Sequence, residues 1–182
     1  MSNNNLKRII LMAAVALMTA LNVNAQDNLQ NEISIAYGGG ANSDIVSSIA
    51  NGMFTGKQTG YWGPISLEYF HYLENSGLAF GGVAAISGCK WDDESSAKST
   101  YFSLMPSVKY RWLNKKNFAM YSKAAIGLTI NSESGNSKSE TTTMFNWQAS
   151  VIGAEFGGAF RGFVELGTGE QGIILAGLRY KF

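Results

Sequence analysis

Hydrophobic and polar residues alternate along much of this chain with a period of two residues. The pattern is clearest at the end, where one parity is apolar and aromatic and the other becomes polar. The apolar parity holds Ile174, Ala176, Leu178, Tyr180 and Phe182, and the other holds Ile173, Leu175, Gly177, Arg179 and Lys181. Successive side chains of a strand point to opposite faces, so the pattern predicts a strand between lipid and a packed lumen.

Seven earlier segments alternate in the same way. They cover residues 33–37, 65–69, 78–86, 102–112, 118–128, 145–151 and 164–166. Eight strands at this spacing indicate a sandwich or a barrel.

The connections between these segments favour a barrel. The first, third and fifth connections are longer and cover residues 40–60, 89–98 and 131–142. The second, fourth and sixth are shorter and cover residues 73–77, 113–117 and 157–160, while the seventh, at 168–170, is also short. Outer-membrane barrels have short periplasmic turns and longer external loops, and closure leaves no strand edge unpaired in lipid. We therefore predict an all-β, eight-stranded antiparallel up-and-down transmembrane β-barrel.

The N-terminus has the pattern of a targeting segment. Lys7 and Arg8 precede an apolar run at 9–21, and Val23-Asn24-Ala25 resembles a cleavage site. The run is short for a spanning helix, although a membrane anchor is the rival interpretation. We predict a cleaved signal peptide at 1–25 and one outer-membrane β-barrel domain at 26–182.

Composition excludes several kinds of site. Without Lys7 and Arg8 the chain keeps 12 basic and 13 acidic residues with no basic block, so nothing points to nucleic acid. Cys89 is the single cysteine and His71 the single histidine, which excludes an internal disulfide and a zinc motif. The acidic run at 92–94, beyond Cys89, lacks the spacing of a calcium loop. No cofactor, metal site or catalytic residue is predicted.

Four features fit the strand pattern less simply. Pro64 and Pro106 remove a ladder donor, so we expect bulges or strand ends there. Glu155 shares parity with the outward Phe145, so either a bulge near Ile152 changes the parity or Glu155 lies at the rim. Residues 43–53 have apolar spacing for a helical turn, and a loop packed on itself explains them equally well.

Charged residues of inward parity form the best-supported candidate site. They are Glu68, Lys109, Lys123, Glu165 and Arg179. Charges in a narrow lumen must be paired or hydrated, and an eight-stranded interior is just wide enough to be filled with side chains. We predict a lumen charge network that plugs the barrel, with Glu165 and Arg179 paired across adjacent strands. A gated ion path or a catalytic dyad is the alternative.

His71 has the outward parity of the second strand, near its periplasmic end. An aromatic ring there suits the membrane interface. A lipid-modifying enzyme would need a nucleophile activated by the imidazole, and the sequence shows no such set.

The signal segment, the eight alternating segments, the loop asymmetry and the terminal 177–182 segment resemble small outer-membrane barrels of Gram-negative bacteria. These are the groups around outer membrane protein X and the barrel domain of outer membrane protein A. Residues 146–157, 163–167 and 171–172 are similar to barrel-domain proteins common in Bacteroides-like bacteria. In that family the barrel-assembly machinery reads the terminal strand, which implies a C-terminal assembly signal of Leu178, Tyr180 and Phe182.

Together these features predict a non-enzymatic integral outer-membrane protein with surface loops for interaction or envelope integrity. We expect a monomer in contact with outer-membrane lipid and lipopolysaccharide. The alternatives are a lipid-modifying barrel enzyme, a small-ligand or hydrophobe channel, and a soluble lipocalin-type barrel. The residues do not specify an extracellular partner.

Overall fold

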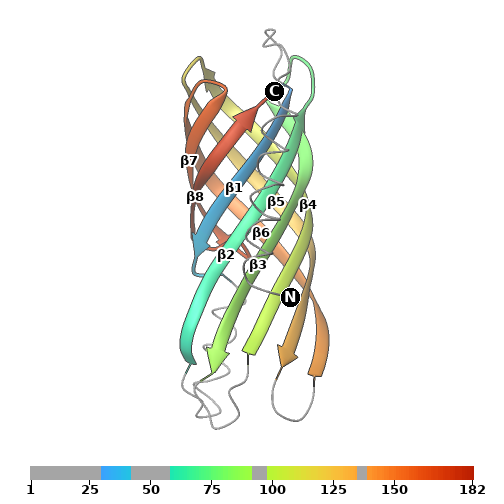
Figure 1. Cartoon of the computed structure of the whole chain (residues 1–182). Coiled ribbons are helices and arrows are strands. Elements are labelled where there is room, and N and C mark those ends of the chain that lie inside the picture. Colours follow the sequence, from blue (N-terminus) through green and yellow to red (C-terminus); the bar gives the residue numbers. More distant parts are fainter. Residues whose placement is uncertain (1–29, 42–57, 92–97, 135–138) are drawn as a thin grey trace. The chain divides into compact units, whose positions relative to one another are not determined.

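Eight antiparallel strands form a closed barrel in the computed structural model, which describes residues 30–41, 58–91, 98–134 and 139–182 (Figure 1). The strands are β1 Asn31–Gly39, β2 Gln58–Tyr72, β3 Leu78–Trp91, β4 Lys98–Lys115, β5 Phe118–Ser134, β6 Ser139–Gly157, β7 Phe160–Gly169 and β8 Ile174–Lys181. Each strand pairs with its neighbours in sequence, and β1 pairs with β8 to close the barrel. The predicted eight-stranded antiparallel barrel is confirmed.

The two ends of the barrel differ in their connections. We call the end that carries the β2–β3, β4–β5 and β6–β7 connections the turn side, and the opposite end the loop side. On the turn side, β4 and β5 are separated by two residues, 116–117, and β6 and β7 by residues 158–159. On the loop side, 40–57 separate β1 and β2. No helix among the described residues is long and apolar enough to cross a membrane.

The predicted parity holds around the barrel except where β6 changes it. Ile35, Leu67 and Leu178 are exposed on the outside, whereas Ser34 and Arg179 are buried inside. Cross-strand register keeps these sets aligned, because Ile35 lies opposite both Leu67 and Leu178. Since the side-chain period of a strand is two, this register places every outward residue of neighbouring strands on one face.

Several predicted strand boundaries are wrong, because polar strand ends were assigned to loops. The β5 and β6 strands extend through most of residues 131–142, where Asn131 lies opposite Thr142. The third connection, predicted at residues 89–98, is likewise shorter, and Cys89 is buried within β3. The fourth connection, predicted at residues 113–117, is confined to residues 116–117. In the fifth connection backbone pairing continues with Ser and Thr side chains, as between Ser132 and Thr141, and such side chains form favourable cross-strand pairs without being apolar. The expected signal peptide and the 43–53 segment lie outside the described residues.

The two prolines behave differently. The β2–β3 register shifts between Trp62 and Ile65, so the expected irregularity at Pro64 is confirmed. The expectation for Pro106 is wrong, because β4 runs through it with Pro106 opposite Gly82. The β4–β5 pairs stop at Leu104 and resume at Ser107 in the same register. This short gap accommodates the missing donor without a bulge.

A bulge in β6 turns Glu155 into the lumen. The β6–β7 register shifts between Ser150 and Ile152. Val151 and Ile152 are consecutive residues that both face outward, 73% and 39% exposed, so the parity changes between them. Glu155 is completely buried, which confirms the bulge and excludes the rim position.

Gly153 provides space for the ring of a fully buried tyrosine of the lumen. It lies opposite Tyr121, and a Cβ atom at Gly153 would be 2.5 Å from the Tyr121 ring. The ring is held in place because its hydroxyl donates a hydrogen bond to Glu165 Oε1 at 2.7 Å. A small residue is therefore required at this position.

We expect Gly153→Ala to lower the free energy of unfolding by about 1–3 kcal/mol, because it overpacks a ring that cannot move freely. Urea unfolding followed by tryptophan fluorescence measures the change. Gly158→Ala is the control, since a Cβ there has no neighbour within 4 Å. Equal stability of the two variants would show that the Tyr121 ring can shift.

Candidate functional site

All five charged residues predicted for the lumen are buried inside the barrel. Lys123 joins two of them, because its Nζ lies 2.6 Å from Glu68 Oε1 and 2.7 Å from Glu165 Oε2. Lys109 Nζ lies 2.7 Å from Glu32 Oε1. These distances are typical of charge-assisted hydrogen bonds.

Arg179 connects the whole network. Its Nη1 lies 2.6 Å from Glu155 Oε2, and its Nε lies 3.3 Å from Glu32 Oε1. Its Nη2 lies 3.3 Å from Glu68 Oε2 and 3.8 Å from Glu165 Oε1. One buried guanidinium, supplied by the strand that closes the barrel, thus faces four carboxylates.

The expected ion pair between Glu165 and Arg179 is present, but it is long, at 3.8 Å. Glu165 makes shorter contacts elsewhere: it accepts hydrogen bonds from Ser150 Oγ at 2.6 Å and Tyr121 Oη at 2.7 Å, in addition to its ion pair with Lys123. Register explains the difference, because Glu165 lies opposite Leu175 on β8, four residues before Arg179. Adjacent strands therefore do not place these two charges at the same depth.

Five further members of the network were not included in the prediction. They are Glu32, Arg111, Glu155, Arg161 and Lys181. Four of them share inward parity with residues already assigned to the lumen, so strand parity was an available signal for those four. Glu155 was hidden by the β6 bulge, which the sequence shows only as a conflict of parity.

Aromatic faces line the cationic part of the lumen. Lys109 Nζ lies 3.8 Å from the centre of the Tyr121 ring, and the Arg179 guanidinium lies 4.1 Å from that of Phe163. The Arg111 guanidinium lies 4.0 Å from the centre of the Tyr72 ring. Ring faces carry negative partial charge, so these contacts help to stabilise buried cations.

A layer of hydrogen-bonded amides and hydroxyls continues the filling toward the loop side. Gln171 Nε2 donates to Glu68 Oε1 at 2.7 Å, which connects this layer to the ion pairs. Glu170 accepts hydrogen bonds from Asn146 Nδ2 at 2.7 Å and Ser103 Oγ at 3.2 Å. The lumen is thus occupied along its axis by connected polar side chains.

His71 lies outside this network, on the outer face near the turn side. Its Nδ1 is 2.9 Å from Asn31 Oδ1, which also accepts a hydrogen bond from the Tyr69 hydroxyl. All three residues are at the exposed start of β1 and end of β2. In the described part of the chain, no group of three or more His, Cys, Asp or Glu side chains could hold a metal ion.

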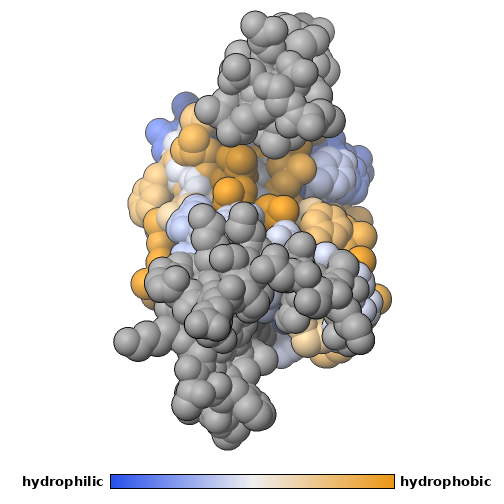
Figure 2. Space-filling model, turned by 60° about the horizontal axis from the view of Figure 1, so that its bottom comes forward, coloured by the Kyte–Doolittle hydropathy of each residue, from blue (hydrophilic) through white to orange (hydrophobic). Residues whose placement is uncertain are grey.

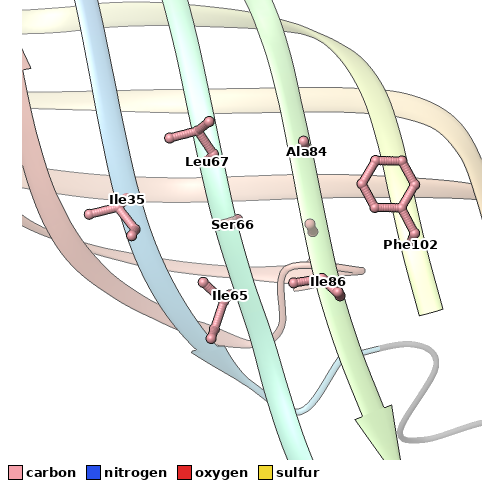
Figure 3. A pocket seen from close by; sticks show the side chains of 8 residues that line it. Ile35, Ile65, Ser66, Leu67, Ala84, Ile86 and Phe102 are labelled. Atoms are coloured by element: carbon pink, nitrogen blue, oxygen red, sulfur yellow. The ribbon is translucent and has the colours of Figure 1, made fainter. Parts of the chain in front are cut away.

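An apolar hollow lies on the outer wall across β1 to β4. It has a volume of about 230 Å³, and its lining includes Ile35, Leu67, Ala84, Ile86 and Phe102 (Figure 3). The small Ala84 forms the hollow between larger neighbours. Ser66 is the polar residue of its lining, and it is buried with its hydroxyl accepting a hydrogen bond from Gln171 Nε2 at 2.9 Å.

No family model matches the sequence, and no curated protein matches it. Among solved structures, the chain is similar to the N-terminal β-barrel domain of OprF from Pseudomonas aeruginosa. They share 13% identity over 86% of this chain and 100% of that one, with a TM-score of 0.44.

The chain is also similar to Ail, the attachment invasion locus protein of Yersinia pestis, at 16% identity over 84% of this chain and 98% of that one. The TM-score is 0.42, and it is 0.45 for Ail in complex with the heparin analogue sucrose octasulfate, at the same identity and coverage. In fold, the chain is a closed eight-stranded antiparallel barrel, and it is similar to these bacterial barrels.

Proposed function

We propose that this chain is a non-enzymatic integral outer-membrane protein, with a lumen closed by its own side chains and a loop side that presents a surface for interaction or envelope integrity. One observation carries the proposal: large apolar side chains cover the outside (Figure 2), while charged ones are buried inside. Soluble monomers rarely expose an apolar patch larger than about a few hundred Å². A lipid-facing barrel requires this inverted arrangement.

Strand lengths support a membrane position. The β1, β7 and β8 strands have 9, 10 and 8 residues, close to the roughly 9–11 residues that cross a bilayer when tilted. The β4 and β6 strands have 18 and 19 residues and so extend well beyond that length. Within the excess of β6, Thr141, Thr142 and Thr143 are exposed in succession, which indicates water on both faces. We assign this loop side to the exterior.

Aromatic residues near the turn side support the opposite boundary. Tyr110, Trp112, Phe156 and Phe160 are exposed close to the ends of their strands. The rings of Phe118 and Phe156 pack with centres 4.8 Å apart. Amphipathic and aromatic rings gather at headgroup depth, so this belt suits the periplasmic interface.

Two partner classes follow from the same assignment. The outer wall would contact lipid, and lipopolysaccharide where it meets the external leaflet. Leu178 and Tyr180 lie on the outward parity of β8, and Phe182 follows that strand, in the order expected of a signal for the barrel-assembly machinery. We expect the folded protein to be a monomer.

Envelope fractionation tests the proposal directly. The protein should remain with outer membranes after carbonate extraction, and its gel mobility should change on heating because a folded barrel resists detergent. Planar bilayers should show no steady conductance if the lumen is filled. Release by osmotic shock as a soluble protein would contradict the membrane assignment, while stable channels would favour the hydrophobe or small-ligand channel.

A lipid-facing charge provides a further test. We expect Leu178→Lys to destabilise the barrel in phosphatidylcholine vesicles by about 2–4 kcal/mol if the site is near the midplane, because the ammonium group must enter the apolar band. Urea unfolding measures the change. Thr142→Lys is the control and should cost little, since Thr142 lies in the solvated part of β6. Similar stability of both variants would place Leu178 in water.

Topology is tested by amine labelling of intact cells. A membrane-impermeant reagent should leave Lys115 and Lys116 unmodified, because both are at the β4–β5 turn on the periplasmic side. Permeabilised cells should show labelling of both. Lys138, between β5 and β6, is the external control. External labelling of Lys116 would invert the proposed orientation.

A further inference from the structure

The turn-side part of the lumen has more cations than its carboxylates can satisfy. Glu155 is surrounded by five cationic side chains: Lys109, Arg111, Arg161, Arg179 and Lys181. Three of these share a single atom, because Arg111 Nε lies 3.5 Å and Arg161 Nη1 lies 3.3 Å from Glu155 Oε1, which Lys181 Nζ also contacts. A carboxylate offers about four acceptor positions, so one carboxylate cannot satisfy this many donors.

The imbalance extends to the whole ion-paired network. Its described members are six cations and four carboxylates: Lys109, Arg111, Lys123, Arg161, Arg179 and Lys181 with Glu32, Glu68, Glu155 and Glu165. The side chains of these ion-paired members carry two more positive than negative charges, while buried Glu170 lies in the polar layer toward the loop side, away from these cations. Buried charge without a counter-charge is strongly unfavourable.

The excess charge is positioned for a ligand. Arg161 is fixed, because its Nε donates to Gly158 O at 2.7 Å and its Nη2 donates to Lys116 O at 3.2 Å. Arg111 Nε is buried and donates no hydrogen bond to any described residue. Lys181 carries three donor hydrogens and has one described acceptor, Glu155. Donors are therefore available beside a rigid guanidinium.

These cations lie at the accessible end of the network. The side chains of Arg111 and Arg161 are each 9% exposed and that of Lys181 is 4% exposed, whereas Lys109 and Arg179 are fully buried. Lys115 and Lys116 add positive charge at the same rim. The exposed carboxylate of the neighbouring β2–β3 turn, Glu74, accepts a hydrogen bond from Gln30 Nε2 at 3.3 Å.

We propose that the turn-side mouth of the lumen binds an oxyanion, of phosphate or phosphate-ester chemistry, between Arg111, Arg161 and Lys181. Such an anion supplies several acceptor oxygens and neutralises the excess charge that Glu155 leaves. Arginine is suited to this role because its planar donors match oxyanion geometry. The phosphate can be free in the periplasm or belong to a lipid headgroup.

The experiment uses the refolded barrel, residues 26–182, in an uncharged maltoside detergent. Sodium phosphate replaces sodium chloride stepwise at constant ionic strength. Two quantities are measured: the midpoint temperature of thermal unfolding and, separately, the ¹⁵N chemical shift of Arg111 Nε. Phosphate should raise the midpoint by several degrees with saturation, since a ligand that binds only the folded state stabilises it. The Arg111 Nε signal should shift over the same concentration range.

Variants distinguish this site from general screening. Arg111→Gln should abolish the phosphate effect, whereas Lys115→Gln removes a charge from the same rim and should retain it. If Arg111→Gln does not fold, the unmodified protein still tests the proposal. Phosphate should change the ¹⁵N chemical shift of its Arg111 Nε, and chloride should not. Equal effects of phosphate and chloride, or a full response in Arg111→Gln, would overturn the proposal.

A second arm identifies the source of the phosphate. The protein is refolded without inorganic phosphate in phosphatidylcholine vesicles with or without phosphatidic acid. A higher midpoint with phosphatidic acid, lost in Arg111→Gln, assigns the site to a lipid headgroup. A response to inorganic phosphate alone assigns it to a soluble ligand. A response to neither overturns the site.

Discussion

Replacing Arg179 with methionine should be among the most destabilising single changes in the barrel, with an expected loss of about 3–5 kcal/mol in the free energy of unfolding. Methionine preserves much of the length of the side chain but removes every charge-assisted hydrogen bond. Four carboxylates then lose their shared guanidinium, and Glu32, Glu68 and Glu155 face one another with fewer cations between them. The cost arises mainly from these carboxylates, which remain buried.

Urea unfolding of refolded protein in lipid vesicles measures the loss. Leu178→Met is the matched control, because it introduces the same residue next to Arg179 in the chain but on the outer face of β8. Arg179→Lys should recover part of the stability, since one ammonium group reaches fewer of the four carboxylates. If Arg179→Met were as stable as the control, water in the lumen would be solvating the carboxylates effectively.

Strand parity accounts for how much of this architecture the sequence could predict. In a closed barrel each strand has an inner and an outer face, so alternation alone assigned Glu68, Lys109 and Lys123 to the lumen before any pairing was known. In the predicted membrane position the eight segments also had to close, because an open edge in lipid would leave backbone groups unpaired. Closure then places Arg179, on the last strand, within reach of charges on the first two.

Depth along the axis could not be predicted in the same way. Which charges meet depends on the register between strands, and register is set by pairing rather than by one strand's own sequence. Glu165 and Arg179 therefore share a face but not a level, and Lys123 approaches Glu165 more closely. Strand ends were also underestimated, because Ser- and Thr-rich strand segments resemble loops in sequence.

The β6 bulge is the clearest case of information absent from a single strand. Parity alone placed Glu155 among lipid-facing residues, where an unpaired carboxylate would be unfavourable. The register shift at Val151 resolves that conflict by inserting one extra residue, and it delivers Glu155 to five cations. A conflict between charge and parity is thus a useful sign of a bulge near a buried site.

Glu155→Gln is expected to destabilise the barrel by about 3–5 kcal/mol in phosphate-free buffer, because it removes the charge on which the turn-side cations depend. Arg161 and Lys181 form no other ion pair with the described residues, so both lose their only carboxylate partner. Lys109, Arg111 and Arg179 keep Glu32. The effect should therefore be concentrated on β7 and β8, whose pairing completes the barrel next to β1.

Coupling distinguishes lost pairing from altered shape. Lys181→Met alone removes a cation from the positive cluster and should cost less than Glu155→Gln. Combined with Glu155→Gln it should restore part of the stability, giving a non-additive coupling of about 0.5–3 kcal/mol in a double-mutant cycle. Leu178→Met combined with Glu155→Gln is the control pair and should be additive, since Leu178 faces outward. Additivity of the Glu155 and Lys181 variants would mean that their contact contributes no net stability.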